Sequence, residues 1–130
     1  LGPMGAVRSV RRLIGNASVG LVPTMGALHE GHMMLLETSI AENTQTLVSV
    51  FVNPTQFNDP TDCSGYPTPL QADLIACEEA GVSAVFLPHY GMMYPDDFTY
   101  RVSEIEERTV LEGDKRPGHF EGVLTVVLKL

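Results

Sequence analysis

Short apolar runs alternate with helical patterns along most of the chain. Residues 19–23 form an apolar run that ends in a proline, and residues 47–52 form a nearly continuous run of β-branched and aromatic side chains. The first run is typical of a strand, and the second is typical of a strand buried on both faces of a parallel sheet. Between them, residues 30–43 place apolar side chains at helical spacing, which predicts a helix with one apolar face. The side chains of that face are Met33, Leu36 and Ile40.

A second helix has sequence signals at both ends. We expect Thr68 as its N-cap, Pro69 at its first helical position, Gln71 as the capping-box partner and Gly81 as its stop. Its predicted apolar stripe consists of Leu70, Leu74 and Cys77. Residues 84–87 then predict a third strand. Strands alternating with helices indicate an open α/β sheet with right-handed crossovers.

The remaining part of the chain gives weaker patterns. Residues 100–102 predict a short strand. From about residue 120, the spacing of Val123, Val127 and Leu130 favours a helix, with a strand as the alternative because several of these residues are β-branched.

Composition narrows the class of protein. The chain has 130 residues, of which 44% are hydrophobic and 18% charged, so we expect one globular domain without an apolar run long enough to span a membrane. The net charge of −8 opposes nonspecific binding to nucleic acid and to anionic membranes. Cys63 and Cys77 do not form a C-x-x-C pair and are expected to be reduced, as in the cytosol. Residues 1–5 lack the layout of a signal peptide and are interpreted as an expression scar.

Polar residues follow the first two predicted strands, at residues 23–32 and 53–57. Ligands of open α/β sheets bind at this edge, where the strands end. His29 and His32 share one face at the start of a predicted helix, whose N–H groups and dipole favour anions. The pair predicts a donor cluster for phosphate oxygens that protonation strengthens once an anion binds, and Gly31 leaves room for a ligand. Surface or capping histidines remain the alternative, and two histidines alone predict no metal site.

Residues 23–32 read PTMGALHEGH and resemble the signature of the pantoate–β-alanine ligases, or pantothenate synthetases. The last four of these residues match the His-x-Gly-His element of the nucleotidyltransferase superfamily. Two further blocks occur in family order, residues 51–57 and residues 111–127. The resemblance extends from about residue 19 to residue 130.

The resemblance implies a Rossmann-like nucleotide-binding domain, an open parallel sheet with helices on both faces. It also implies a two-step reaction that belongs to the coenzyme A pathway and takes place in the cytoplasm. ATP, assisted by Mg²⁺, converts pantoate to pantoyl adenylate and pyrophosphate, and β-alanine then displaces AMP to give pantothenate. The full-length enzyme is expected to be a homodimer that uses neither nucleic acid nor membrane as a partner.

The resemblance also implies roles for particular residues. His29 and His32 are the expected catalytic residues, holding the ATP phosphates together with Met25, Gly26 and Asn53. Pantoate is expected to contact Met25, through its backbone, and the amide of Gln56. The supporting wall of the site is expected to consist of Glu112 and Arg116.

Simpler interpretations stay open for several of these positions. Asn53-Pro54 also fits a turn, Glu112 and Arg116 also fit a solvated ion pair, and His119 fits a helix cap as well as a ligand. Thr68 stands where the family has an arginine.

The family's Lys-bearing and Lys-Met-Ser-like segments and its C-terminal domain have no counterpart in this sequence. We therefore expect residues 1–130 to be an incomplete domain, truncated at its C-terminal side and inactive alone. The alternatives are a noncatalytic module that binds a small carboxylic acid or serves in assembly, and another nucleotidyltransferase.

Overall fold

The computed structural model describes residues 8–9, 11–12, 14–56, 69–103 and 119–130. The chain divides into two compact units. The first comprises Leu1–Val50 and Pro69–Pro88, and the second comprises Phe51–Thr68 and His89–Leu130. Each unit is described by itself below.

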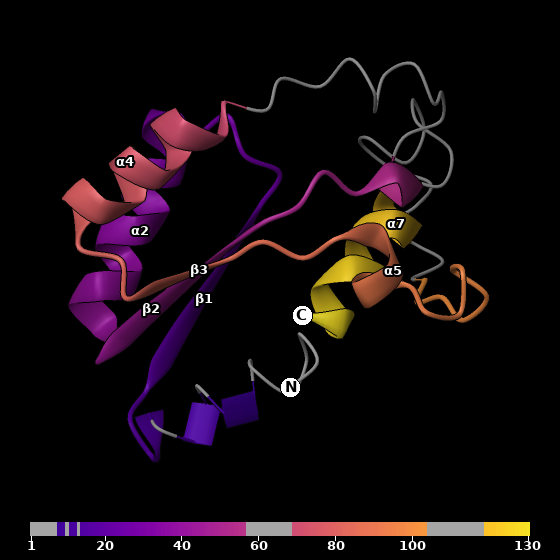
Figure 1. The fold of residues 1–130 in the computed structure, drawn as a ribbon, viewed down its shortest axis with the longest axis horizontal. Coiled ribbons are helices and arrows are strands. Elements are labelled where there is room, and N and C mark those ends of the chain that lie inside the picture. Colours follow the sequence, from indigo (N-terminus) through magenta and orange to yellow (C-terminus); the bar gives the residue numbers. More distant parts are fainter. Residues whose placement is uncertain (1–7, 10, 13, 57–68, 104–118) are drawn as a thin grey trace. The chain divides into compact units, whose positions relative to one another are not determined.

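The first unit is built on a parallel sheet in the order β1-β2-β3 (Figure 1). Its strands are β1 (Val19–Thr24), β2 (Gln45–Val50) and β3 (Ala84–Phe86). Helix α2 (Glu30–Glu42) connects β1 to β2, and helix α4 (Leu70–Ala80) precedes β3. The register aligns Val22 with Val48 and Val48 with Val85. The predicted strands and the open parallel α/β architecture are thereby confirmed.

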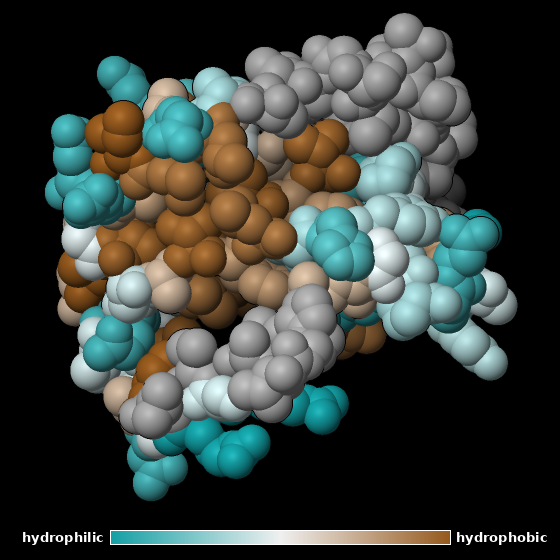
Figure 2. Space-filling view, in the orientation of Figure 1, coloured by the Kyte–Doolittle hydropathy of each residue, from teal (hydrophilic) through white to brown (hydrophobic). Residues whose placement is uncertain are grey.

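Both helices pack on the same face of this sheet. Val22 and Val48 are partners in register, and they share one buried cluster with Leu36 of α2 and Cys77 of α4. Full burial of a side chain such as Leu36 stabilises the fold by about 1.5–3 kcal/mol. Apolar surface gathers over the sheet in Figure 2, and the unit leaves large apolar side chains exposed. These are Leu21, Met34, Leu35, Leu70, Ile75 and Leu87.

The close approach of α2 to β1 depends on Gly20. A Cβ atom at Gly20 would lie 1.9 Å from the hydroxyl of Ser39 and 2.7 Å from the amide nitrogen of Asn43. That hydroxyl is buried and hydrogen-bonded to the hydroxyl of Thr46 on β2, at 2.7 Å. The C-terminal part of α2 is therefore set against β1 and β2 by tight packing.

Helix α4 differs from its prediction at its first turn. It begins at Leu70 with Pro69 as the N-cap, so the prediction that Pro69 is the first helical residue is wrong, and Pro69 itself makes no side-chain capping bond. The predicted capping box joins Gln71 to Thr68 and stays a prediction. Pro69 has a non-helical ψ of 66° and its carbonyl accepts the N–H of Asp73, which is the geometry of an N-cap. Thr68 lies outside the described residues. The predicted stop is confirmed, since Gly81 adopts the left-handed conformation with φ of 90°.

The predicted apolar stripe of α4 is also partly wrong. Cys77 is buried as expected, but Leu70 is 41% exposed. Asp73 is 3% exposed and occupies the buried face instead, because its carboxylate binds backbone N–H groups.

The second unit contains η1 (Pro54–Gln56), α5 (Tyr90–Met93) and α7 (His119–Lys129), with α7 packed against η1. The predicted C-terminal helix is confirmed. The strand predicted at residues 100–102 is wrong, because the N–H of Val102 donates to the hydroxyl of Thr125 on α7, at 2.8 Å, and not to a neighbouring strand.

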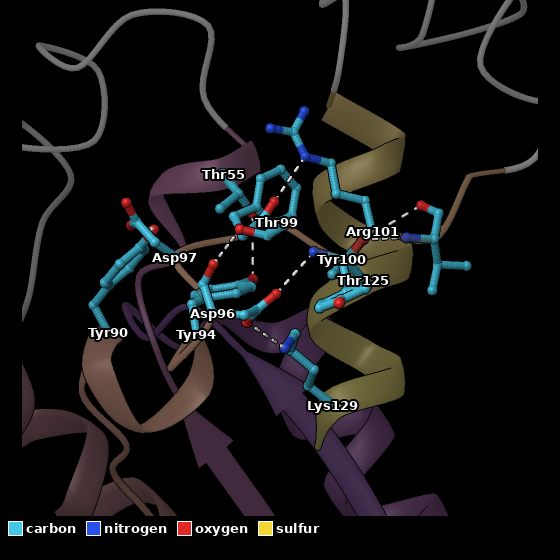
Figure 3. A network of polar contacts seen from close by, with 12 residues as sticks. Thr55, Tyr90, Tyr94, Asp96, Asp97, Thr99, Tyr100, Arg101, Thr125 and Lys129 are labelled. Atoms are coloured by element: carbon cyan, nitrogen blue, oxygen red, sulfur yellow. Dashed lines mark hydrogen bonds and ion pairs between the residues drawn. The ribbon is translucent and has the colours of Figure 1, made fainter.

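Aromatic rings and ion pairs organise this unit (Figure 3). Tyr94 is buried and its ring meets that of Phe98 edge-to-face, with centroids 5.4 Å apart. Lys129 Nζ lies 3.1 Å from Asp96 Oδ1. The hydroxyl of Tyr90 donates to Asp97 at 2.8 Å, and this bond is the main reason that the pKa of Tyr90 rises to about 12.

Candidate functional site

The loop that leaves β1 is anchored to the end of β2 by Thr24. The hydroxyl of Thr24 donates to the carbonyl of Ser49 at 3.0 Å and accepts the N–H of Gly26 at 3.1 Å. One side chain thereby ties the carboxyl ends of two neighbouring strands and begins the turn into α2. This is the sheet edge at which ligands of open α/β sheets bind.

The next residues of the loop adopt left-handed backbone conformations. Gly26 has φ of 83° and Ala27 has φ of 53°. A Cβ atom at Gly26 would lie 3.0 Å from Asp73 Oδ2 and 3.1 Å from Val50 Cγ1, so the turn needs glycine for both space and conformation.

Asp73 holds this turn from α4. Its Oδ2 atom accepts the N–H of Ala27 and its Oδ1 atom accepts the N–H of Leu28, both at 2.9 Å. Hydrogen bonds to a buried carboxylate are each worth about 1.5–3 kcal/mol. The path of the chain into α2 is therefore set by a side chain far away in sequence.

His29 and His32 form a reciprocal cap at the start of α2. His29 is the N-cap, and its Nδ1 atom accepts the N–H of Gly31 at 3.0 Å. The Nδ1 atom of His32 accepts the N–H of His29 at 3.1 Å. The two rings lie 4.1 Å apart between centroids. A capping box usually pairs Ser or Thr with Glu or Gln, and here two imidazoles take both positions.

The capping bonds determine where the imidazole protons lie. Each Nδ1 atom accepts a hydrogen bond, so in the neutral rings each proton is on Nε2. Burial and the neighbouring His29 lower the pKa of His32, although Asp73 acts to raise it. The lowered pKa favours the neutral ring. Protonation of the rings was predicted to strengthen anion binding. It would also break the cap, because a protonated Nδ1 cannot accept a hydrogen bond.

The arrangement has the kind of donors that bind anions. Two Nε2–H donors stand at the N-terminus of a helix, where N–H groups and the positive end of the dipole also favour negative charge. His29 is exposed and His32 half-buried, so a ligand can reach them. Met25 is half-buried and Gly26 buried on the same loop. The structure thus brings together four of the predicted residues, Met25, Gly26, His29 and His32.

Asn53 and Gln56 belong to the second unit. Asn53 is 1% exposed, and its amide donates to the carbonyl of Gly122 at 3.2 Å. Its Oδ1 atom accepts from the hydroxyl of Tyr94 at 2.8 Å and from the hydroxyl and N–H of Thr55 at 2.7 and 3.2 Å. Asn53 therefore binds η1, α5 and α7 together. Its predicted contact with a phosphate stays a prediction.

Three predicted positions give less information. Gln56 is the last residue of η1, and only its backbone is described. Glu112 and Arg116 lie outside the described residues. The backbone of His119 begins α7. His89 caps α5 by accepting the N–H of Met92.

Sequence reasoning missed Asp73 and Thr24. A signal for Asp73 was available, because a carboxylate between Leu70 and Leu74 lies on the face assigned to the core. Nothing comparable marks Thr24, whose role depends on the pairing of β1 with β2.

In the described part of the chain, no group of three or more His, Cys, Asp or Glu residues could hold a metal ion. The same residues include no helix that is both long and apolar enough to cross a membrane.

Comparison with known proteins places this geometry in a family. The pantoate-β-alanine ligase family model matches residues 4–130. Pantothenate synthetase of Bdellovibrio bacteriovorus is 52% identical over 115 residues, which cover 88% of this chain and 46% of the relative. That of Helicobacter pylori strain 26695 is 50% identical over 128 residues, covering 96% of this chain and 46% of the relative.

Solved structures agree. Pantoate-β-alanine ligase from Francisella tularensis, complexed with β-γ ATP and β-alanine, superposes with a TM-score of 0.87 at 47% identity, covering 93% of this chain and 47% of that one. Pantothenate synthetase from Thermus thermophilus gives 0.85 at 44% identity, covering 95% of this chain and 45% of that one. The chain thus spans about half the length of the relatives it matches. With this match along nearly all of its residues, the chain belongs to the pantoate-β-alanine ligase family.

Proposed function

We propose that the His29–His32 pair at the start of α2 binds the phosphates of ATP, and that the chain serves the ATP-dependent joining of pantoate to β-alanine. The observation that carries the proposal is the reciprocal cap, which aims two Nε2–H donors away from the helix that they cap. The relative from Francisella tularensis, described as complexed with β-γ ATP and β-alanine, supports the same ligand class.

In the proposed first step, a pantoate carboxylate oxygen bonds to the α-phosphorus of ATP and pyrophosphate leaves. In the second, the amine of β-alanine bonds to the activated carbonyl carbon and AMP leaves with its bonding electrons. Negative charge builds on phosphate oxygens during the first step. Donors already in place at those oxygens lower its barrier, because no reorganisation is needed at the moment of reaction.

The chain's own residues divide these tasks in the proposal. The imidazoles of His29 and His32 donate to phosphate oxygens, and the turn at Gly26 lets phosphate approach the backbone. Met25, through its backbone, and Gln56 hold pantoate, while Asn53 organises the residues around η1.

Other parts of the proposal rest on the family. Glu112 and Arg116 supply the far wall, and the predicted cytoplasmic location and homodimer stay predictions. Among the described residues, no group of three or more His, Cys, Asp or Glu could hold Mg²⁺. Mg²⁺ is bound mainly by substrate phosphates in many ATP sites and would arrive with ATP.

The test is calorimetric titration of the chain with Mg-ATP and, separately, with pantoate. His29→Asn removes the Nε2–H donor but keeps a good N-cap, so it separates ligand binding from helix capping. His89→Asn is the matched control, because His89 also caps a helix through Nδ1. We expect Mg-ATP to bind about tenfold more weakly to His29→Asn, and unchanged to His89→Asn. Equal affinity of wild type and His29→Asn would overturn the proposed role of the pair.

Titration with pantoate distinguishes the ligase from the alternative of a noncatalytic module. A module that binds a small carboxylic acid would bind pantoate and show no heat with Mg-ATP. Binding of both ligands supports the ligase assignment.

A further inference from the structure

Asp73 is a buried carboxylate outside the residues expected to touch a substrate. It lies in the first turn of α4 and accepts the N–H groups of Ala27 and Leu28, which precede it by 46 and 45 residues. These bonds join a helix that leads into β3 to the loop that follows β1. Charge-assisted hydrogen bonds of this length are among the stronger contacts in proteins.

The turn that Asp73 holds is unfavourable by itself. Ala27 has φ of 53°, a left-handed conformation that its Cβ atom disfavours. Leu28 follows, and then His29 must sit at the N-cap of α2 in an extended conformation, with φ of −128°. A change in the turn would therefore move the residue whose imidazole faces the ligand.

The negative charge of Asp73 would weaken phosphate binding if the carboxylate had no structural role near the site. A carboxylate beside a phosphate site repels the ligand unless its charge is offset. Here two backbone N–H groups and the positive end of the α4 dipole offset it. His32 still senses the carboxylate, which acts to raise its pKa against the larger effects of burial and His29.

We propose that Asp73 is a positioning residue for the phosphate site, whose carboxylate clamps the Ala27–Leu28 backbone so that His29 and His32 keep their Nε2–H donors aimed at the ligand. The proposal rests on the proposed function of the histidine pair. It requires both carboxylate oxygens, because each accepts a different N–H. Asparagine at this position keeps one acceptor and turns an N–H donor toward the other N–H, with almost no change in volume.

The test compares three isotope-labelled variants by NMR and by Mg-ATP titration. Asp73→Asn breaks the clamp, Asp73→Asn with Ala27→Gly breaks it but removes the penalty of the turn, and Glu79→Gln is the control. Glu79 is exposed on the same helix, so this control changes the charge of α4 without touching the loop.

We expect the side-chain nitrogens of His29 and His32 to report one Nε2–H tautomer in wild type and in Glu79→Gln. In Asp73→Asn they should report a mixture of tautomers, with Mg-ATP affinity about tenfold lower. Ala27→Gly should restore part of both, since glycine adopts the left-handed turn without a clamp. A loss of stability alone would not change the tautomers of a folded protein.

Unchanged tautomers and unchanged affinity in folded Asp73→Asn overturn the proposal. If Asp73→Asn does not fold, the wild-type protein supplies the test. Its Ala27 and Leu28 amide protons should resonate far downfield and be protected from hydrogen exchange. Unprotected exchange of these two protons would overturn the proposal. The two hypotheses fail separately. If wild type does not bind Mg-ATP but the tautomers mix in Asp73→Asn, the clamp stands and the phosphate site falls.

Discussion

The Nδ1 atom of His32 accepts the backbone N–H of His29 at 3.1 Å, so one imidazole both caps α2 and faces the proposed ligand. Nδ1 can accept only while it is unprotonated. Burial, followed by the proximity of His29, lowers the pKa of His32 below its ordinary value. The cap and the ring's protonation are therefore linked.

This linkage predicts a pH dependence of stability. The folded chain releases the His32 proton at a lower pH than the unfolded chain, so the unfolded chain binds more protons as the pH falls through that interval. Folding stability should therefore decrease as the pH falls from about 7 to about 5. His32→Gln should show a smaller decrease, because glutamine keeps the capping box without titrating. Thermal unfolding of both proteins across this range measures the difference, and identical slopes would contradict the link.

Two glycines with similar backbone conformations should respond differently to alanine. Gly26 and Gly81 have φ of 83° and 90°, so each substitution costs about 1–2 kcal/mol for the left-handed conformation. Gly26→Ala should cost more, because its Cβ would press on Asp73 and Val50, whereas a Cβ at Gly81 would meet no described atom within 4 Å apart from its neighbours in sequence. Urea denaturation compares them. Equal losses would show that the turn has room that the structure does not give it.

Asn53 should matter more to stability than the tyrosine that it binds. Tyr94→Phe removes one donor from Asn53 Oδ1 while both Thr55 donors remain, so we expect a loss of about 1 kcal/mol. Asn53→Ala leaves the carbonyl of Gly122 and three donors without their partner, and should cost about 2–4 kcal/mol. Urea denaturation of the single and double variants checks the order. A larger loss in Tyr94→Phe than in Asn53→Ala would mean that the hydroxyl of Tyr94, and not the amide of Asn53, is the main polar link of this unit.

Local patterns predicted most of the first unit. The apolar runs of β1 and β2, the helical spacing around Leu36 and the left-handed stop at Gly81 each depend on neighbours in sequence. Asp73 could not be assigned in this way, because its partners are 45 and 46 residues away and meet it only after the crossover helix packs. Helical periodicity likewise placed Leu70 in the core, because it does not show that the carboxylate of Asp73 occupies the buried face.

The second unit was harder to predict because side chains replace regular backbone pairing. The residues near Val102 look strand-like, yet the hydroxyl of Thr125 takes the N–H that a neighbouring strand would accept. The motif at Asn53-Pro54 was recognised, but sequence gives no indication that its amide joins η1 to α5 and α7.

The most direct measurement of the central claim follows the side-chain nitrogens of His29, His32 and His89 by NMR during titration with Mg-ATP. We predict that the Nε2–H signals of His29 and His32 shift together, while their Nδ1 signals keep the signature of acceptors and His89 is unaffected. Unmoved His29 and His32 signals at saturating Mg-ATP, or protonation of both Nδ1 atoms on binding, would contradict the account of a capped pair that donates through Nε2.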